Sequence, residues 1–519
     1  MDQIEKILPL NTAQLRNLRN WDTSDWPSVT IPVVVECPHG MSRREMANGI
    51  GVLIERHEAL RSRLRDGFQE VLSGKAVDLP MRVVSEGSDE EVDAHSWIES
   101  VPPDVTALKC LLVMSGGAVR SVKLSVSHVF VDALGARALA SDLDRILRAG
   151  IPDSAPPRQA SVFAQGVDDL EIKANTEHWK AMLADMPRSC TYSGVSRDAY
   201  EPVEHVVEVL SPDHENILAE ACTKLKASAY AVMTAVMSSI VQAISGQCRQ
   251  VLRSTYANRF SPADFGAIAQ VAQAVFVPID GARRDTFAER VEKITKSTLS
   301  TYHLGRYDAN GLLDWLDRDE AGHGAAFQPA FEVNYVPSAR DEDEIVTAYA
   351  ETAESRTYRT RERIDPRAAK PDLVLSVTYE PGLVLLLSAR RPVYNSVSIS
   401  ELMSVCVDSA VSFCANPHIS VEAVSPPESR NIGERLLGHR SGVTVDVSAV
   451  QALVTSYPGI ESCSLEMRST EGPGPQLLAR VRASRPVRAE DVLRTLRQKQ
   501  PWMAGSVVPD QLVVTEFCS

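Results

Sequence analysis

The segment SHVFVDALGARALASDLDRIL, residues Ser127 to Leu147, carries the clearest structural pattern of the chain. It overlaps the stretch SVKLSVSH, Ser121 to His128, in which apolar and polar residues alternate with the period of two that is typical of a β-strand. From Ala136 to Leu147 the small and apolar residues recur on one helix face, which places Asp142 on the outer face. The segment therefore predicts a strand, a short loop and a helix, with a histidine at the end of the strand.

Two residues of this segment are candidates for chemistry. His128 ends the predicted strand, and Asp132 stands where the helix is expected to begin. In a chain with 11 histidines an H-x-x-x-D spacing can arise by chance and is weak evidence for a site. The stronger evidence is the position of the two residues, at the end of a strand and at the start of a helix. The histidine is either a packed core residue or a proton acceptor, because the ordinary pKa of a histidine is about 6.5. The aspartate is expected first of all to be a helix N-cap.

The composition limits the classes of protein to which the chain can belong. Its 519 residues are 44% hydrophobic and 24% charged, as in globular proteins, and the net charge of -14 disfavours nucleic acid or anionic membranes as partners. Nine scattered cysteines without a C-x-x-C pair indicate a reducing cytoplasm, and MDQIEKILPL lacks the apolar core of a signal peptide. The apolar stretch from Ser228 to Ser245 is interrupted by polar residues, so a buried helix is expected there.

Several common motifs are absent from the sequence. It contains no G-x-x-x-x-G-K-[ST], no G-x-G-x-x-G after a strand, no H-E-x-x-H and no G-x-S-x-G. Nucleotide-phosphate, dinucleotide, zinc-protease and serine-hydrolase sites are therefore disfavoured, and no bound cofactor or metal is expected. Strands and helices alternate without a strict βα rhythm, which predicts an α+β fold.

Other composition shifts suggest joints and loops. GIPDSAPPRQAS, from Gly150, and AVSPPESRNIGERLLGHRSG, from Ala423, are rich in proline or charge and are expected to separate packed units. The acidic stretches SEGSDEEVD, from Ser85, and SARDEDE, from Ser338, are predicted to be solvated loops.

Taken together, the segment around His128 resembles the H-H-x-x-x-D-G motif of nonribosomal peptide synthetase condensation domains, which belong to the chloramphenicol-acetyltransferase-like superfamily. RHEALRSRL, from Arg56, resembles the family's R-H-E-x-L-R-T-x-F. STYANR, ending in Asn258 and Arg259, resembles its N-R segment, and FGAIAQ, around Gly266, resembles its G-x-F-V-N segment. ILPLNTAQ, VFAQ and TYHLGRYD add weaker landmarks in the same order, so the resemblance covers about residues 5 to 425.

The sequence departs from the family pattern at three positions. Ser127 replaces the first histidine of the motif, Ala133 replaces its glycine, and Gln270 stands where the later segment has asparagine. Ser127 is predicted to lie on the strand face opposite to His128. Ala133 is expected to narrow the space beside the reacting carbonyl.

The resemblance also implies roles for individual residues. His128 would be the catalytic base or positioning group, and Asp132 would support the site by pairing with Arg61, with Arg63 as the second choice. The candidates for the wall of the substrate tunnel are residues of the second half of the chain, namely Asn258, Gly266, Gln270 and Asn334.

For the fold, the resemblance implies two acetyltransferase-like lobes in a V-shaped pseudo-dimer. The N-terminal lobe would span residues 1–165. Residues 166–425 would hold the inter-lobe segment and the C-terminal lobe, and 426–442 would be a linker. Residues 443–519 resemble the small C-terminal α+β subdomain of adenylate-forming enzymes. The large adenylation core is absent, so this part is interpreted as a remnant or docking module.

The function implied is that of a free-standing, cytoplasmic condensation-type acyltransferase of secondary metabolism, such as antibiotic biosynthesis. It would form an amide or ester from an acyl or aminoacyl thioester on the 4'-phosphopantetheine of a carrier protein, with a small or carrier-bound amine or hydroxyl as acceptor. Two alternatives stay open. One is a non-catalytic platform that recruits carrier proteins or a tailoring enzyme, and the other is an acyltransferase that uses a coenzyme A thioester.

Overall fold

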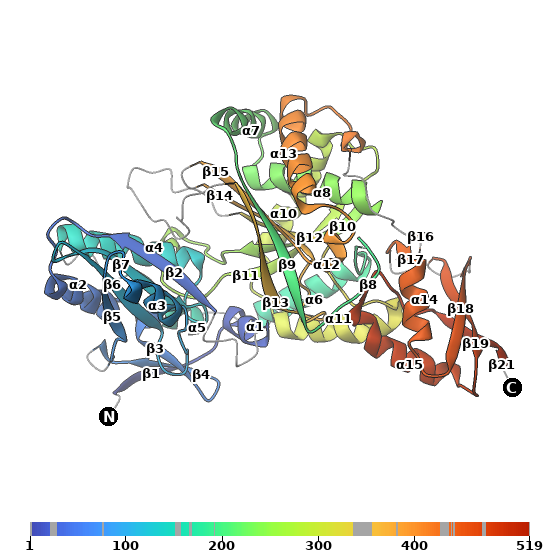
Figure 1. Ribbon diagram of the computed structural model, residues 1–519, viewed down its shortest axis with the longest axis horizontal. Coiled ribbons are helices and arrows are strands. Elements are labelled where there is room, and N and C mark those ends of the chain that lie inside the picture. The colour runs from blue at the N-terminus through green and yellow to red at the C-terminus, as the bar shows by residue number, and fades with distance from the viewer. Residues whose placement is uncertain are drawn as a thin grey trace.

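The structure is a computed structural model that describes residues 3–20, 29–74, 77–150, 157–165, 169–190, 192–335, 355–379, 382–425, 435–436, 439, 442–469 and 474–517. Helices and strands alternate irregularly along these residues and form three main sheets, each packed against helices (Figure 1). The predicted α+β class is confirmed.

The first sheet, on the left in Figure 1, has the strand order β2-β7-β6-β5. Helices α2 (Arg43–Arg56) and α4 (Ala133–Ala149) share a buried apolar cluster with this sheet, while α3 (Asp89–Ile98) packs with β5 and β6 in a separate cluster. The three serines of β7, Ser121, Ser125 and Ser127, are buried too, whereas Arg120 is exposed. The strands are β2 (Thr30–Glu36), β5 (Met81–Ser85), β6 (Leu108–Ser115) and β7 (Ala118–Ser127).

Two predictions for this part of the chain are wrong. The acidic stretch after Ser85 is not a loop throughout, because Asp89 to Asp93 belong to α3, where acidic residues favour the positive N-terminal end of a helix. Asp142 is not on an outer face: it is 6% exposed, and its carboxylate accepts hydrogen bonds from His57 (2.7 Å) and Arg56 (3.2 Å). Burial alone would raise the pKa of Asp142, but these partners lower it below its usual value.

A small three-stranded sheet lies beneath the first one, with the order β1-β4-β3. It consists of β1 (Ile4–Pro9), β4 (Phe68–Leu72) and β3 (Ser62–Arg65). Helix α2 leads into it through the short 3-10 helix η2 (Glu58–Arg61). Helix α1 (Thr12–Asn20) follows β1 and contacts helix α11 (Ala309–His323) and strand β11 (Gln273–Asp280), which belong to the second half of the chain.

The second sheet, in the centre of Figure 1, has seven strands in the order β11-β10-β12-β14-β15-β9-β13. Its strands are parallel at β10-β12-β14 and antiparallel elsewhere. These strands are β9 (Tyr200–Val209), β10 (Arg249–Tyr256), β11 (Gln273–Asp280), β12 (Phe331–Tyr335), β13 (Arg356–Arg363), β14 (Leu373–Tyr379) and β15 (Leu383–Ala389).

Helices on both sides of this sheet share one large apolar core with it (Figure 1). One group is α7 (Pro212–Leu225), α8 (Ala229–Ser245), α10 (Phe287–Tyr302) and α13 (Ile399–Ala415). The other is α6 (Asp169–Ala184) and α11. The predicted buried helix is α8, which Ser228 caps. In the described ranges no single helix is long and apolar enough to cross a membrane, although α7 and α8, bent by 100°, match such a span as a pair.

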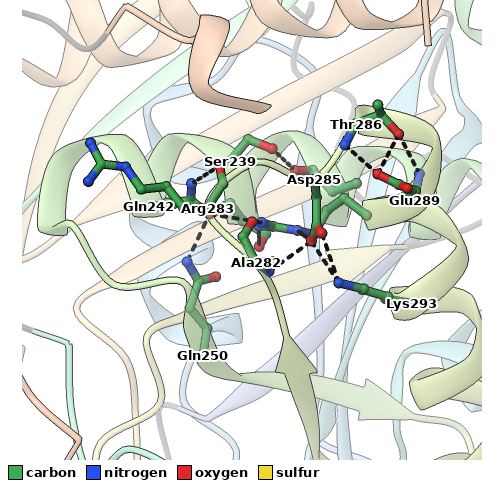
Figure 2. A network of polar contacts seen from close by, with 12 residues as sticks. Ser239, Gln242, Gln250, Ala282, Arg283, Asp285, Thr286, Glu289 and Lys293 are labelled. Atoms are coloured by element: carbon green, nitrogen blue, oxygen red, sulfur yellow. Dashed lines mark hydrogen bonds and ion pairs between the residues drawn. The ribbon is translucent and has the colours of Figure 1, made fainter. Parts of the chain in front are cut away.

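A buried polar network joins α8 and α10 at the edge of this core (Figure 2). Arg290 is 0% exposed and donates hydrogen bonds to Asp285 (3.2 Å), Ser238 (2.8 Å) and Gln242 (2.8 Å). Asp285 also accepts from Lys293 and from the Ala282 amide, as Figure 2 shows. The buried charge of Arg290 is paired and hydrogen-bonded within the protein. This network therefore stabilises the fold and needs no ligand to neutralise it.

The third sheet, on the right in Figure 1, consists of β18 (Ile460–Arg468), β19 (Gln476–Ala483) and β21 (Gln511–Phe517). Helices α14 (Val447–Thr455) and α15 (Ala489–Lys499) cover it with a core of their own. The predicted linker, 426–442, and the acidic stretch from Ser338 lie mostly outside the described residues, so the domain boundaries stay predictions.

Candidate functional site

The histidine of the motif lies in a turn between a strand and a helix. Strand β7 ends at Ser127, which is 0% exposed, and the His128 amide donates to the Val29 carbonyl (3.0 Å). His128 itself is half-buried, and Ala133 is the exposed first residue of α4. The strand-loop-helix arrangement predicted from the sequence is confirmed, with the helix starting three residues earlier than expected.

A glutamine from the second half of the chain holds the His128 ring. The Nδ1 atom of His128 lies 3.1 Å from Oε1 of Gln270, which is 2% exposed. The Nε2 amide of Gln270 donates to the Ala272 carbonyl (2.9 Å), so its oxygen faces the ring. An amide oxygen can only accept, and therefore Nδ1 carries the ring proton and Nε2 is the basic nitrogen of the neutral imidazole.

Asp132 gathers donors from both halves of the chain. Its carboxylate is almost fully buried (the residue is 1% exposed) and accepts from the Gly135 amide (2.8 Å) as the N-cap of α4. It forms a two-pronged ion pair with Arg259, with both N–O distances 2.9 Å. The amides of Val271 (3.1 Å) and Ala272 (3.0 Å) donate to the same carboxylate. These bonds fasten the start of α4 to the loop that connects β10 and β11.

The predicted pairing of Asp132 with Arg61 is wrong. Arg61 lies in η2, where its guanidinium pairs with Glu5 (2.6 Å) and donates to the Leu72 carbonyl. The second choice, Arg63, pairs with Glu70 (2.7 Å) across the small sheet. Both arginines are engaged within the small sheet. The partner of Asp132 is instead Arg259, the arginine of the N-R segment, to which the sequence analysis assigned no role.

The loop between β10 and β11 brings two of the tunnel candidates close to Asp132. Asn258 has a φ of 52°, and its amide donates to the carbonyls of Val271 (3.0 Å) and Gly305 (3.1 Å), so it fixes the loop in which Gln270 lies. Gly266 is in the same loop but is exposed, at the end of α9 (Pro262–Phe265). Asn334 lies elsewhere, on β12 in register with Ser376. The structure therefore groups Asn258 and Gln270 with the motif.

A pocket of about 130 Å³ lies between the N-terminal part of the chain and this loop. Asn11 and Asn258 line it, and the Asn11 amide donates to the Gln270 carbonyl (2.9 Å), so the pocket wall and the histidine support are continuous. Arg158 and Arg306 also line it and give it a cationic rim. Arg158 and Arg306 were missed, because nothing in the local sequence distinguishes them from other arginines. Arg259 was noted as part of the N-R segment but was given no role.

The charges around the pocket are partly compensated. Arg158 pairs with Asp264 (2.8 Å), while the Arg306 guanidinium lies 4.4 Å from the centre of the Phe260 ring. The pKa of Asp264 is lowered: burial opposes this, but hydrogen bonds from Ser261 and Phe260 and the charge of Arg158 outweigh it. Within the described ranges, no group of three or more histidine, cysteine or acidic side chains is placed to hold a metal ion.

Comparison with known proteins gives consistent results. The family model for the condensation domain matches residues 4–432. The structure is similar to the condensation domain of the Monacolin K polyketide synthase MokA, with a TM-score of 0.63, 13% identity and coverage of 81% of this chain and 100% of that one. It is also similar to the first condensation domain of the calcium-dependent antibiotic synthetase in complex with a substrate analogue, with a TM-score of 0.60, 17% identity and coverage of 81% and 99%.

A curated relative is the "Probable non-canonical nonribosomal peptide synthetase (NRPS) CymA" of Salinispora arenicola (strain CNS-205). It is 24% identical over 416 residues, and the match covers 73% of this chain but only 5% of that protein. The similarity of residues 443–519 to an adenylation-enzyme subdomain stays a prediction. Because the family model spans most of the chain, the chain belongs to the condensation domain family.

Proposed function

We propose that the protein is a condensation-type acyltransferase that joins a carrier-bound acyl or aminoacyl group to an amine or hydroxyl. Condensation domains are generally acyltransferases that act on carrier-protein-bound substrates. The observation that carries the proposal for this chain is the contact between Gln270 and Nδ1 of His128, which makes Nε2 the basic nitrogen. A positioned imidazole of this kind accelerates proton transfer by about 10² to 10⁴-fold.

In the proposed reaction, the acceptor nitrogen or oxygen attacks the thioester carbonyl carbon. The new C–N or C–O bond forms, the C–S bond breaks, and one proton passes from the acceptor through Nε2 of His128 to the departing sulfur. No covalent enzyme intermediate is needed, because holding both reactants together supplies much of the acceleration. Asp132 would act at a distance, by keeping the turn after His128 in place.

The pocket beside Gln270 is the proposed entry for the substrate arm. Its wall is shared with the residues that support His128, and its rim carries Arg158 and Arg306. Two guanidinium groups suit the phosphate of a 4'-phosphopantetheine arm, because arginine binds phosphate oxygens in a planar, two-pronged geometry. The carrier protein is therefore the proposed partner, and its prosthetic group is substrate, not a resident cofactor.

The test is single-turnover transfer from a loaded carrier protein to the cognate acceptor, followed by intact mass. His128→Ala is expected to reduce transfer by about 10²-fold or more while carrier binding and folding stay unchanged. His418→Ala, at an exposed histidine far along the chain, is the matched control and should transfer normally. If wild type and His128→Ala both bind the loaded carrier and neither transfers, the enzyme proposal fails and the recruitment platform is the better account.

A further inference from the structure

Two amide side chains at the start of α1 form a reciprocal pair. Asn11 directly precedes the helix, and Gln14 is its third residue. The Oδ1 atom of Asn11 accepts from the Gln14 backbone amide (2.9 Å), and the Oε1 atom of Gln14 accepts from the Asn11 backbone amide (3.0 Å). Such a capping box satisfies backbone donors of the first helical turn through the two side-chain oxygens, so the NH₂ groups of both amides stay available for other partners.

Both NH₂ groups reach the candidate site. The Nδ2 atom of Asn11 donates to the backbone carbonyl of Gln270 (2.9 Å), whose side chain contacts Nδ1 of His128. The Nε2 atom of Gln14 donates to the carbonyl of Val129 (3.1 Å), the residue that follows His128. These two hydrogen bonds therefore hold both chain segments that meet in the contact between His128 and Gln270.

A buried series of hydrogen bonds fixes the orientation of the Gln14 amide. Gln14 is 2% exposed, and its Nε2 atom also donates to Oε1 of Gln69 (2.8 Å). The Nε2 atom of Gln69 donates to the Ser62 hydroxyl (2.8 Å), which donates to the Glu58 carbonyl (2.8 Å). Because the oxygen and both N–H groups of Gln14 are in use, its amide has little freedom to turn, and the Val129 carbonyl is held in one place.

Other capping boxes of the chain show that capping does not require amides. Ser42 and Glu45 begin α2 in this way, and Thr286 and Glu289 begin α10. Their hydroxyl and carboxylate groups satisfy the first turn through exposed hydrogen bonds and offer no NH₂ group to a neighbouring segment. The cap of α1 therefore does not by itself account for the two amides or for the direction of their donors.

We propose that Asn11 and Gln14 are positioning residues that hold His128 against Gln270. The contact joins groups 142 residues apart, so its length depends on what holds the two segments together. Asp132 binds the second segment through backbone amides, and the box of α1 binds both segments through backbone carbonyls. The inference rests on the proposed function, because the position of His128 matters for transfer only if this residue takes part in it.

The first test is spectroscopic and needs no substrate. Gln14→Met keeps a similar volume but removes the donor to the Val129 carbonyl. Asn11→Asp keeps the oxygen that caps the helix but removes the donor to the Gln270 carbonyl. With the ring kept neutral, the ring ¹⁵N shifts of His128 in both variants are expected to move from a single Nδ1–H tautomer toward a mixture.

The second test is single-turnover transfer from a loaded carrier protein. Gln14→Met is expected to lower the rate at saturating carrier by about tenfold or more, because a small displacement of a reacting group is costly. The half-saturating carrier concentration should stay unchanged, since the buried Gln14 side chain faces Gln69 and Val129 and the pocket is lined by its neighbours Thr12 and Ala13.

Gln250→Met is the matched control for the loss of a buried amide. Gln250 is 0% exposed, and its Nε2 atom likewise donates to two carbonyls, those of Ser238 (3.0 Å) and Gln247 (2.8 Å). It lies at the start of β10, at the other end of this strand from the loop that holds Gln270. This variant should lower the melting temperature as Gln14→Met does, but keep the wild-type shifts of His128 and the wild-type rate.

The two tests separate this proposal from the proposed function. If the wild-type protein transfers nothing, the enzyme proposal fails, while the ¹⁵N shifts still report whether the two amides position the ring. If Gln14→Met does not fold, Asn11→Asp decides the question alone, because its helix cap is kept. The positioning role is overturned if the folded variants keep the wild-type shifts of His128, if Gln250→Met changes these shifts equally, or if an active protein loses no transfer rate in Gln14→Met.

Discussion

Asp132 illustrates how one carboxylate joins distant parts of the chain. It caps α4 through Gly135 and pairs with Arg259, 127 residues further along. Because both groups are almost fully buried, removing one leaves an uncompensated charge, which costs about 3 to 5 kcal/mol. We expect Asp132→Ala and Arg259→Met each to lower the free energy of unfolding by about that amount in urea denaturation. A double-mutant cycle should show coupling between Asp132→Ala and Arg259→Met, whereas the effects of Arg61→Ala and Asp132→Ala on the free energy of unfolding should be additive. Additive effects of Asp132→Ala and Arg259→Met would contradict the pairing.

Gln270 offers a second test at the residue scale. Gln270→Met keeps a similar volume but removes the acceptor at Nδ1, so the fixed tautomer of His128 should be lost. We expect the ring ¹⁵N shifts of His128 to move from a single Nδ1–H tautomer toward a mixture, and single-turnover transfer to fall by about tenfold. His205, which lies far from Gln270 in the second sheet, serves as the internal reference for the spectrum. Unchanged ¹⁵N shifts at His128 would show that Gln270 does not set the tautomer.

Among the elements, the edge strand β13 has a pH-sensitive anchor. The hydroxyl of Thr360 on β13 shares a hydrogen bond with one ring nitrogen of His205 on β9 (2.8 Å), and the ring of Tyr358 on β13 stacks on the His205 ring. The hydroxyl of Ser388 on β15 lies 2.8 Å from the other ring nitrogen. Burial lowers the pKa of His205, and Arg390 reinforces this while Glu362 opposes it.

A lowered pKa means that the folded strand prefers the neutral ring. Its contribution to stability is present above the unfolded pKa of about 6.5 and is lost as the pH falls through the lower folded value. We expect amide exchange in β13, corrected for the intrinsic rate, to accelerate between pH 7.5 and pH 5. His205→Gln should remove this difference. Equal corrected exchange at both pH values in the wild-type protein would count against His205 as the anchor.

At the scale of the whole molecule, the C-terminal part of the chain contacts the part that holds the second sheet at several points. Strand β20 (Met503–Ala504) pairs with β8 (Val195–Ser196), the Val508 amide donates to Gly324 (2.6 Å), and the Gly194 amide donates to Asp446 (3.1 Å). Ala325 is part of the apolar core of the C-terminal part. Through these contacts the C-terminal part packs directly against the part of the chain that holds the second sheet.

Gly194 is the tightest point of this contact. A Cβ atom there would lie 2.6 Å from the Cβ of Ala449 and 2.8 Å from the Asp446 carboxylate, so Gly194→Ala should force the two parts to separate locally. We expect faster limited proteolysis of the protein and a lower melting temperature. Gly51→Ala, inside α2 where a Cβ would have no atom within 4 Å, should lower neither protease resistance nor the melting temperature, because alanine is the better helix former. Normal protease resistance of Gly194→Ala would show that the contact adjusts easily.

The sequence alone determined the local elements and the family. The strand, turn and helix around His128 and the capped helix α8 were predictable because period and caps are encoded within a few residues. Only the tertiary structure decided the partners: Arg259 and not Arg61 for Asp132, Gln270 for His128, and His57 for Asp142. The physical reason is that these groups are separated by 85 to 142 residues, and buried polar groups take whichever donor or acceptor the packed chain brings within reach.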